Sequence, residues 1–279
     1  MLEYDFMRNA FAASGIVAVV AGVAGYFLVL RGQAFAGHAL SHVGFAGATG
    51  AALLGISPVS GMLGLMVLGG IAMGALGQRL QGSDVAIGAV LALSLGLGML
   101  FLHFFTAYAS QVTALLFGNV LGVDSRMLWT LVVSGILCLA LLAGISRPLI
   151  FASLQPELAE ARGVSLRMVG ILYLIVVAVV TAACIQIVGV LLVFTLLVCP
   201  GAAAQRLTSR LGRGIALSLL LALVEAWLGI AFAYFTDWPA SFWISALSVG
   251  TYLAAVAASR WMDQRGPARA PPHFHPHSH

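Results

Sequence analysis

The chain has 279 residues, of which 61% are hydrophobic and only 8% are charged, and its mean hydropathy is +1.06. In soluble domains about a quarter of all residues are charged. The composition of this chain therefore excludes a soluble protein and also a protein with a single membrane anchor. The net charge of +4 gives no indication of nucleic-acid binding, and all thirteen basic residues are arginine, which excludes a P-loop ATPase because the Walker A motif needs a lysine.

Apolar runs along the chain predict an all-α, polytopic membrane bundle of about nine spans. The seventh run is short and contains Pro200 near its end, which predicts a broken helix. The stretch VTALLFGNVLG, between the fourth and fifth spans, is too short to cross and is expected to form a surface or re-entrant helix. The predicted spans cover residues 10–30, 33–55, 58–78, 85–105, 127–146, 168–187, 189–204, 214–235 and 239–259.

Arginines indicate the orientation of these spans. Strict alternation leaves only Arg8 and Arg126 on one side of the membrane and places the other arginines on the opposite side. The positive-inside rule makes the arginine-rich side cytoplasmic. The N-terminus is then expected outside and the C-terminus inside.

The second span carries two histidines, His38 and His42, in the segment AFAGHALSHVGFAG. Residues four apart lie on the same face of a helix, so both imidazoles can point at one ligand. Histidine suits zinc well, and ionisable side chains within a membrane usually mark a functional site. The structural alternative is a pair of imidazoles that bond to carbonyls of neighbouring helices.

Two further polar residues lie within predicted spans. Glu225 is deep in the eighth span, and His103 is near the outer end of the fourth. Each is a candidate metal ligand along a transport path, and each could equally have a local hydrogen-bond partner. Glu225 is the stronger candidate because burial of an unpaired carboxylate is unfavourable.

The longest internal polar segment covers residues 146–167 and contains PELAEARG. This motif predicts a short helix with Pro156 at its start, Glu157 and Glu160 in its early turns, Arg162 late and Gly163 as its terminator. A solvated loop helix is one interpretation. The cytoplasmic position and the apolar neighbours also suit docking onto a partner protein.

The tail at residues 266–279 is rich in proline and histidine and is predicted to be a disordered cytoplasmic segment. Its alternating histidines could capture a metal ion from an extended chain, and an incidental polar tail is an equal alternative. These histidines are His273, His275, His277 and His279.

Together these features resemble the permease subunits of ABC importers for zinc, manganese and iron. The resemblance rests on FAGHALSHVGFAGATG, ALLFGNVLGV, SLQPELAEARGVSL, VGVLLVFTLLVCPGAAAQRL and FTDWPASFWI, and it covers nearly the whole chain. It implies a type II ABC importer-like permease domain at residues 1–265, with a cytoplasmic coupling segment at about 147–166. The PELAEARG helix, including Pro156 and Gly163, resembles the coupling helix that contacts the ATPase subunit.

The resemblance also implies partners and a location. It implies a homodimer of permeases in the lipid of the bacterial cytoplasmic (inner) membrane, a separate ATP-binding subunit, and an extracytoplasmic metal-binding protein. The family commonly has a GDxxxH pattern in the second span, where this chain has His38 in place of the aspartate. Because imidazole replaces a hard carboxylate, zinc is expected as the transported substrate rather than as a permanent cofactor.

Three other functions stay open at this point. A manganese or iron importer would have the same architecture. A proton- or sodium-coupled secondary carrier could act alone, without an ATPase. An intramembrane enzyme is the third, although the residue after His38 is Ala39 and an HExxH motif is therefore absent at this site.

Overall fold

The structure is a computed structural model that describes residues 3–76, 83–104, 116–190 and 192–265. These residues form ten α-helices and one short 3-10 helix, and no strand occurs among them, which confirms the predicted all-α fold. The helices are α1 (Asp5–Leu30), α2 (Ala34–Leu53), α3 (Pro58–Leu76), α4 (Ser83–His103), η1 (Val120–Gly122), α6 (Ser125–Leu154), α7 (Pro156–Ala161), α8 (Leu166–Val188), α9 (Val193–Leu207), α10 (Leu211–Thr236) and α11 (Ala240–Arg265).

Seven of these helices are long and apolar enough to cross a membrane, whereas the sequence predicted about nine spans. The two predicted spans that do not meet this criterion are α2 and α9. In α2 the two histidines and several glycines lower the mean hydropathy. With only 15 residues, α9 rises about 22 Å, less than the ~30 Å of a hydrocarbon core.

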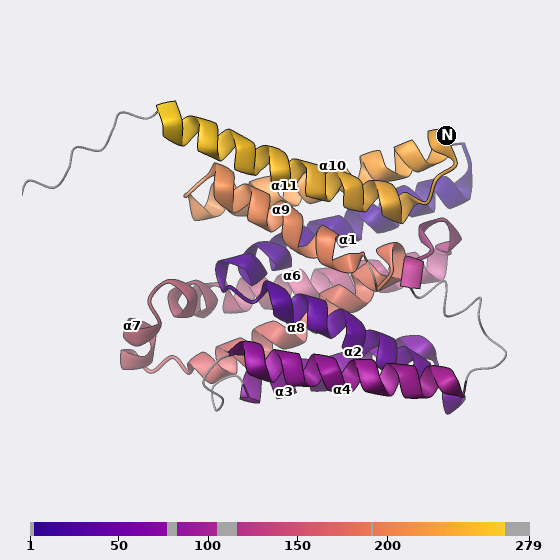
Figure 1. Ribbon diagram of the computed structural model, residues 1–279, viewed down its shortest axis with the longest axis horizontal. Helices are drawn as coiled ribbons and strands as arrows, with labels where there is room; N and C mark the ends of the chain where they lie inside the picture. Colours follow the sequence, from indigo (N-terminus) through magenta and orange to yellow (C-terminus); the bar gives the residue numbers. More distant parts are fainter. Residues whose placement is uncertain (1–2, 77–82, 105–115, 191, 266–279) are drawn as a thin grey trace, which may run out of the picture.

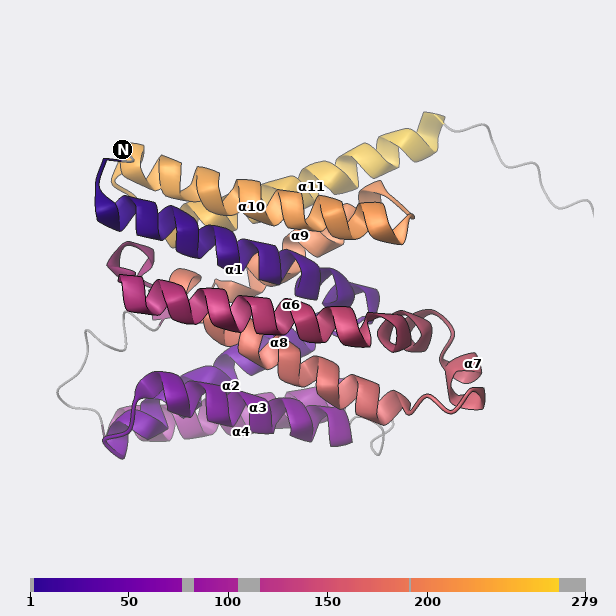
Figure 2. The same cartoon turned by 180° about the vertical axis from the view of Figure 1, so that it is seen from behind.

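The long helices run back and forth between two ends of the bundle (Figures 1 and 2). One end carries α7 and the last residues of α11, and the other carries the N-terminus. We call these the α7 end and the N-terminal end. Arg31 and Arg162 follow helices that finish at the α7 end, while Arg8 and Arg126 begin helices at the N-terminal end.

The centre of the bundle is formed by α1 and α8, which are mostly buried, while α3, α4, α6 and α11 direct most of their surface outward. Close packing at the centre depends on small residues. A Cβ atom at Gly25 of α1 would lie only 1.7 Å from the Leu197 carbonyl oxygen of α9. The two helices can therefore cross this closely only with glycine at that position.

The α6 helix differs from its prediction. The fifth span was expected to end near residue 146, but α6 continues through Pro148 to Leu154. Leu149 and Ala152 are buried, so packing holds the helix beyond the proline. Its 30 residues rise about 45 Å, which is more than a bilayer core requires, and α7 follows after one residue.

The expected break near Pro200 is also wrong. Helix α9 continues through Pro200, and the interruption lies earlier, between the end of α8 at Val188 and the start of α9 at Val193. Gly189 has φ +87° and Gly118 has φ +75°, and a Cβ at Gly118 would lie 2.4 Å from the Ile187 carbonyl oxygen. Two backbone segments meet there, and only glycine permits both the dihedral and the approach.

The structure describes seven of the eleven residues of the predicted surface or re-entrant helix VTALLFGNVLG, 116–122, and the first four lie outside the described residues. Its last three residues form the 3-10 helix η1, and the Asn119 side chain accepts a hydrogen bond from the Gly122 N–H at 3.1 Å. Asp124 then caps α6 by accepting from the Met127 N–H at 2.7 Å.

Candidate metal site

The two histidines of α2 lie side by side, as their spacing predicts. The ring centroids of His38 and His42 are 4.8 Å apart, with an angle of 84° between the ring planes. Zinc–nitrogen bonds are about 2.0–2.1 Å long, so side-chain rotations can bring one nitrogen of each ring to the same ion. Neither imidazole makes a hydrogen bond to another described residue, which leaves the ring nitrogens available.

Aromatic side chains surround His38. The Phe35 ring stacks on it at 6.2 Å between centroids, and the Phe194 ring of α9 meets it edge-on at 5.4 Å. Both histidines are half-buried. The pair is therefore held against an apolar wall on one side, while part of each imidazole is not covered by the described residues.

Sequence reasoning did not identify Phe194 as part of this site. It lies far from α2 in the sequence, in a continuous apolar run. It reaches His38 only because α9 packs against α2. No local pattern in the sequence indicates that contact.

Glu225 occupies a different and closed environment between α10 and α11. It is 1% exposed, and its two carboxyl oxygens accept hydrogen bonds from Ser248 Oγ at 2.6 Å and Thr251 Oγ1 at 2.5 Å. These hydroxyl groups supply the polar partners that a buried carboxyl group needs. Glu225 therefore has the local partners that the sequence left as its alternative.

His103 is the last residue of α4, is exposed, and packs its ring against Phe104 at 5.4 Å. Phe101, two residues before His103, lies beside Gly50 of α2. Along α2, Gly50 is about 12 Å beyond His42. The fold thus keeps His103 toward the end of the bundle. Among the described residues, no three His, Cys, Asp or Glu side chains are grouped so that they could hold a metal ion.

The predicted PELAEARG helix is confirmed as α7, with Pro156 in its first turn and Gly163 at φ +80° after its end. Ala159 is fully buried and anchors α7 to the rest of the chain. Glu157, Glu160 and Arg162, with Leu158 between them, are exposed at the end of the molecule. Helix α7 lies at one end of the bundle (Figure 2), and its exposed residues give it a mixed charged and apolar surface.

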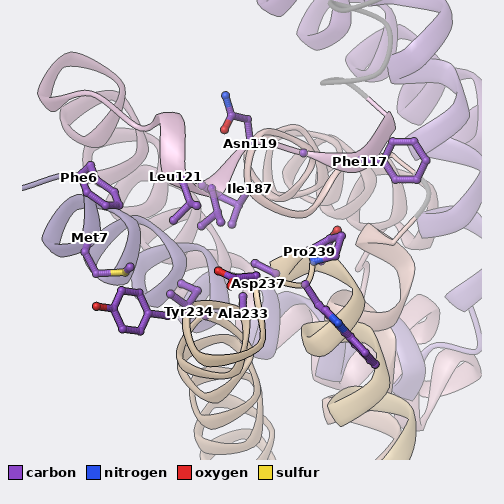
Figure 3. A pocket seen from close by; sticks show the side chains of 16 residues that line it. Phe6, Met7, Phe117, Asn119, Leu121, Ile187, Ala233, Tyr234, Asp237 and Pro239 are labelled. Atoms are coloured by element: carbon purple, nitrogen blue, oxygen red, sulfur yellow. The ribbon is translucent and has the colours of Figure 1, made fainter. Parts of the chain in front are cut away.

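A cavity of about 780 Å³ opens at the N-terminal end. Figure 3 shows Asp237 directed into it, with Met7, Tyr234 and Leu121 around the carboxylate. Asp237 has the left-handed φ of +56° and ends α10. The motif FTDWPASFWI supplies one wall, but the opposite wall comes from α1 and residues 117–121, which the sequence did not connect with it.

The four tail histidines, His273, His275, His277 and His279, lie outside the described residues, as does the whole predicted tail. Their capture of metal stays a prediction.

Comparisons with known proteins agree on one family. The family model described as the ABC 3 transport family matches residues 3–259. The manganese transport system membrane protein MntC of Halalkalibacterium halodurans is 32% identical over 238 residues, covering 85% of this chain and 82% of that protein. The manganese import system permease protein ScaB of Streptococcus gordonii is 30% identical over 233 residues, covering 83% of this chain and 84% of that protein.

A solved structure has the same fold. PsaBC from Streptococcus pneumoniae, determined in complex with Fab, contains a chain with a TM-score of 0.83 and 25% sequence identity. The match covers 94% of this chain and 96% of the other. The arrangement of helices is therefore that of the solved chain over almost the entire length of both.

Proposed function

Since this chain belongs to the ABC 3 transport family and is an ABC metal-transporter permease in a bacterial membrane, we propose that it forms the path by which Zn²⁺ enters the cytoplasm. The single observation that carries the choice of ion is the pair of imidazoles, His38 and His42, on one face of α2. Imidazole is a good zinc ligand, whereas manganese favours oxygen donors.

The site is suited to passage rather than storage. Closed structural zinc sites use four protein ligands, while the two imidazoles of this chain leave coordination positions open. Both rings must be neutral to bind, so uptake should weaken in acid. Because transport requires release, an incomplete ligand set is an advantage.

A second copy of the chain completes the proposed path. The uncovered sides of His38 and His42 would face the partner copy across a two-fold axis, which places the same residues opposite one another. A homodimer would thus offer up to two histidine pairs along one central passage.

Two other partners are part of the proposal. A separate ATP-binding subunit would dock on α7, whose exposed Glu157, Glu160 and Arg162 can pair with complementary charges. An extracytoplasmic metal-binding protein would deliver the ion at the N-terminal end. Membership of an ABC family favours this assembly over an ion-coupled carrier that acts alone.

Import of Mn²⁺ is the second candidate function. It is supported by the names of two relatives, the manganese transport system membrane protein MntC and the manganese import system permease protein ScaB. His38 argues against Mn²⁺, because an imidazole stands where the resemblance described above implies an aspartate.

The test is ion uptake by the reconstituted importer. The full chain, its ATP-binding subunit and its metal-binding protein are placed in liposomes, and Zn²⁺ and Mn²⁺ compete for ATP-driven import. We expect Zn²⁺ to be preferred, and we expect His38→Ala and His42→Ala each to lower import at least tenfold, the loss expected when one of two metal–ligand bonds is removed.

Ser41→Ala is the matched control. Ser41 lies between the two histidines but is buried and donates its hydroxyl to the His38 carbonyl oxygen. Its substitution should leave import near the wild-type rate. Preference for Mn²⁺ by the wild-type importer would replace zinc with the second candidate, and wild-type import by both histidine variants would remove the ligand role.

A further inference from the structure

The proposed ATPase contact and the proposed ion ligands lie on different elements of the chain. Helix α7 packs on α6 and α8, whereas His38 and His42 belong to α2. If ATP hydrolysis moves α7, some side chain must pass that movement to α2. The following inference rests on the proposed function.

Arg31 lies where the two parts meet. It belongs to the three-residue turn, Arg31 to Gln33, that joins α1 to α2. Its Nε donates a hydrogen bond to Gln33 Oε1 at 3.1 Å, and its Nη1 donates to Ser153 Oγ at 3.3 Å. One guanidinium thus holds both the start of α2 and the last turn of α6.

The same guanidinium also rests on α8. Its central carbon is 5.6 Å from the centroid of the Tyr173 ring, a cation–π distance. Tyr173 is fully buried and donates its hydroxyl to the Ala24 carbonyl oxygen of α1 at 2.8 Å. The ring is therefore a fixed surface against which Arg31 is positioned.

Ser153 connects Arg31 with α7. It is anchored in α6 through a 2.5 Å hydrogen bond from its hydroxyl to the Leu149 carbonyl oxygen. Only Leu154 and Gln155 separate it from Pro156, the first residue of α7. A displacement of α7 relative to the bundle would act on Ser153 almost directly.

The other end of the connection is equally short. From Gln33 to His38 the helix rises only about 7 Å. A Cβ at Gly37 would lie 2.7 Å from Leu28 of α1, so the first turn of α2 is packed tightly on α1. The turn and His38 are expected to move together.

Charge burial indicates that Arg31 is more than a convenient surface residue. Removal from water lowers the pKa of its guanidinium below the ordinary value, which reflects the unfavourable burial of a cation. Arginine suits this position because its planar group can donate in two directions and stack on a ring simultaneously, whereas lysine cannot.

We propose that Arg31 is a positioning residue that links movement of the α7 end to the histidine-bearing helix α2. It holds Gln33, Ser153 and Tyr173 in one network, so that ATP hydrolysis and ion movement remain coupled. Without it, the ATPase subunit would still dock and turn over, but α2 would no longer follow.

The experiment measures ATP hydrolysed per ion imported by the complete importer in liposomes, with whichever of Zn²⁺ or Mn²⁺ the wild type carries. Arg31→Gln should lower import about tenfold while ATP hydrolysis stays within about twofold, since the loss of hydrogen bonds to a charged group has effects of this size. Arg31→Lys should recover only part of the coupling. Arg167→Gln is the matched control, because Arg167 is an exposed arginine at the same end.

The ratio distinguishes coupling from a purely structural role. Equal losses of hydrolysis and import in an assembled Arg31→Gln importer, or no change in either, would overturn the proposal. If Arg31→Gln does not assemble, Ser153→Ala decides: a raised ratio supports the link, and a wild-type ratio refutes it. Failure of the wild type to import either ion would instead refute the proposed function.

Discussion

Two polar clusters lie inside the bundle, and they differ in how completely the protein satisfies them. Both oxygens of Glu225 accept hydrogen bonds from hydroxyl groups, and the residue is buried. The imidazoles of His38 and His42 contact rings and apolar groups, remain half-buried, and make no hydrogen bond to other described residues.

This difference separates a structural polar group from a ligand-binding one. A buried polar group with all its partners in place contributes to packing of its own helices. A polar group in a membrane without such partners must find them elsewhere, in an ion, in water or in a second chain. By this argument Glu225 and its hydroxyl partners join α10 to α11, whereas His38 and His42 are the residues that we propose to bind the ion.

The largest effect is expected at Glu225, whose carboxyl group has a complete set of hydrogen-bond partners. Glu225→Ala removes the acceptor of two buried hydroxyl groups and leaves a void, so the free energy of unfolding should fall by about 3 kcal/mol. Thermal unfolding of the purified permease in detergent measures this loss. Zinc import per folded molecule should change little.

Glu225→Gln serves as the control, because the amide keeps one acceptor and occupies nearly the same volume. It should be much more stable than the alanine variant. Wild-type stability of Glu225→Ala together with lost import would reverse the comparison and make Glu225 a ligand.

The sequence predicted most of this architecture because its signals are local. Apolar runs located the long helices, although α6 and α11 end eight and six residues beyond their predicted spans. The i,i+4 spacing paired His38 with His42, and Pro156 with Gly163 delimited α7. Each of these depends on neighbours within one or two turns.

Features that depend on distant neighbours were missed. Helix α6 continues past Pro148 because other helices bury Leu149. Glu225 is satisfied by hydroxyl groups of the following helix, and Phe194 meets His38 across the bundle. Such contacts depend on how helices pack, which a single sequence does not encode in its local pattern.

A substitution at His38 tests whether the imidazole pair selects the transported ion. His38→Asp replaces one imidazole with a carboxylate, and the ratio of Mn²⁺ to Zn²⁺ import should rise about tenfold because oxygen donors favour manganese. Competition between the two ions in liposomes measures the ratio.

The same substitution at His103 is the control for that experiment. His103→Asp introduces an identical carboxylate on α4, away from the proposed site, and should leave the ratio unchanged. An unchanged ratio in His38→Asp as well would mean that the ion is selected elsewhere in the importer.

A smaller effect is expected at the ring that positions His38. Phe194→Leu keeps an apolar side chain but removes an edge-on aromatic contact, so import should fall about fivefold, in line with the ~1 kcal/mol of such a pair. Phe45→Leu is the control, since Phe45 lies on α2 but packs toward Gly98 of α4. Equal losses in both variants would show a general packing effect.

The smallest effect should come from His103→Ala. The imidazole of His103 is exposed, and its one ring contact among the described residues is with Phe104. Its substitution should therefore change stability and import by less than about 0.5 kcal/mol each. The measurement is Zn²⁺ import at limiting concentration, where a ligand at the entrance would matter most. A tenfold loss of import would mean that an exposed histidine at the end of the bundle can also bind the ion. Ligands would then not be limited to histidines that lack hydrogen-bond partners inside the bundle.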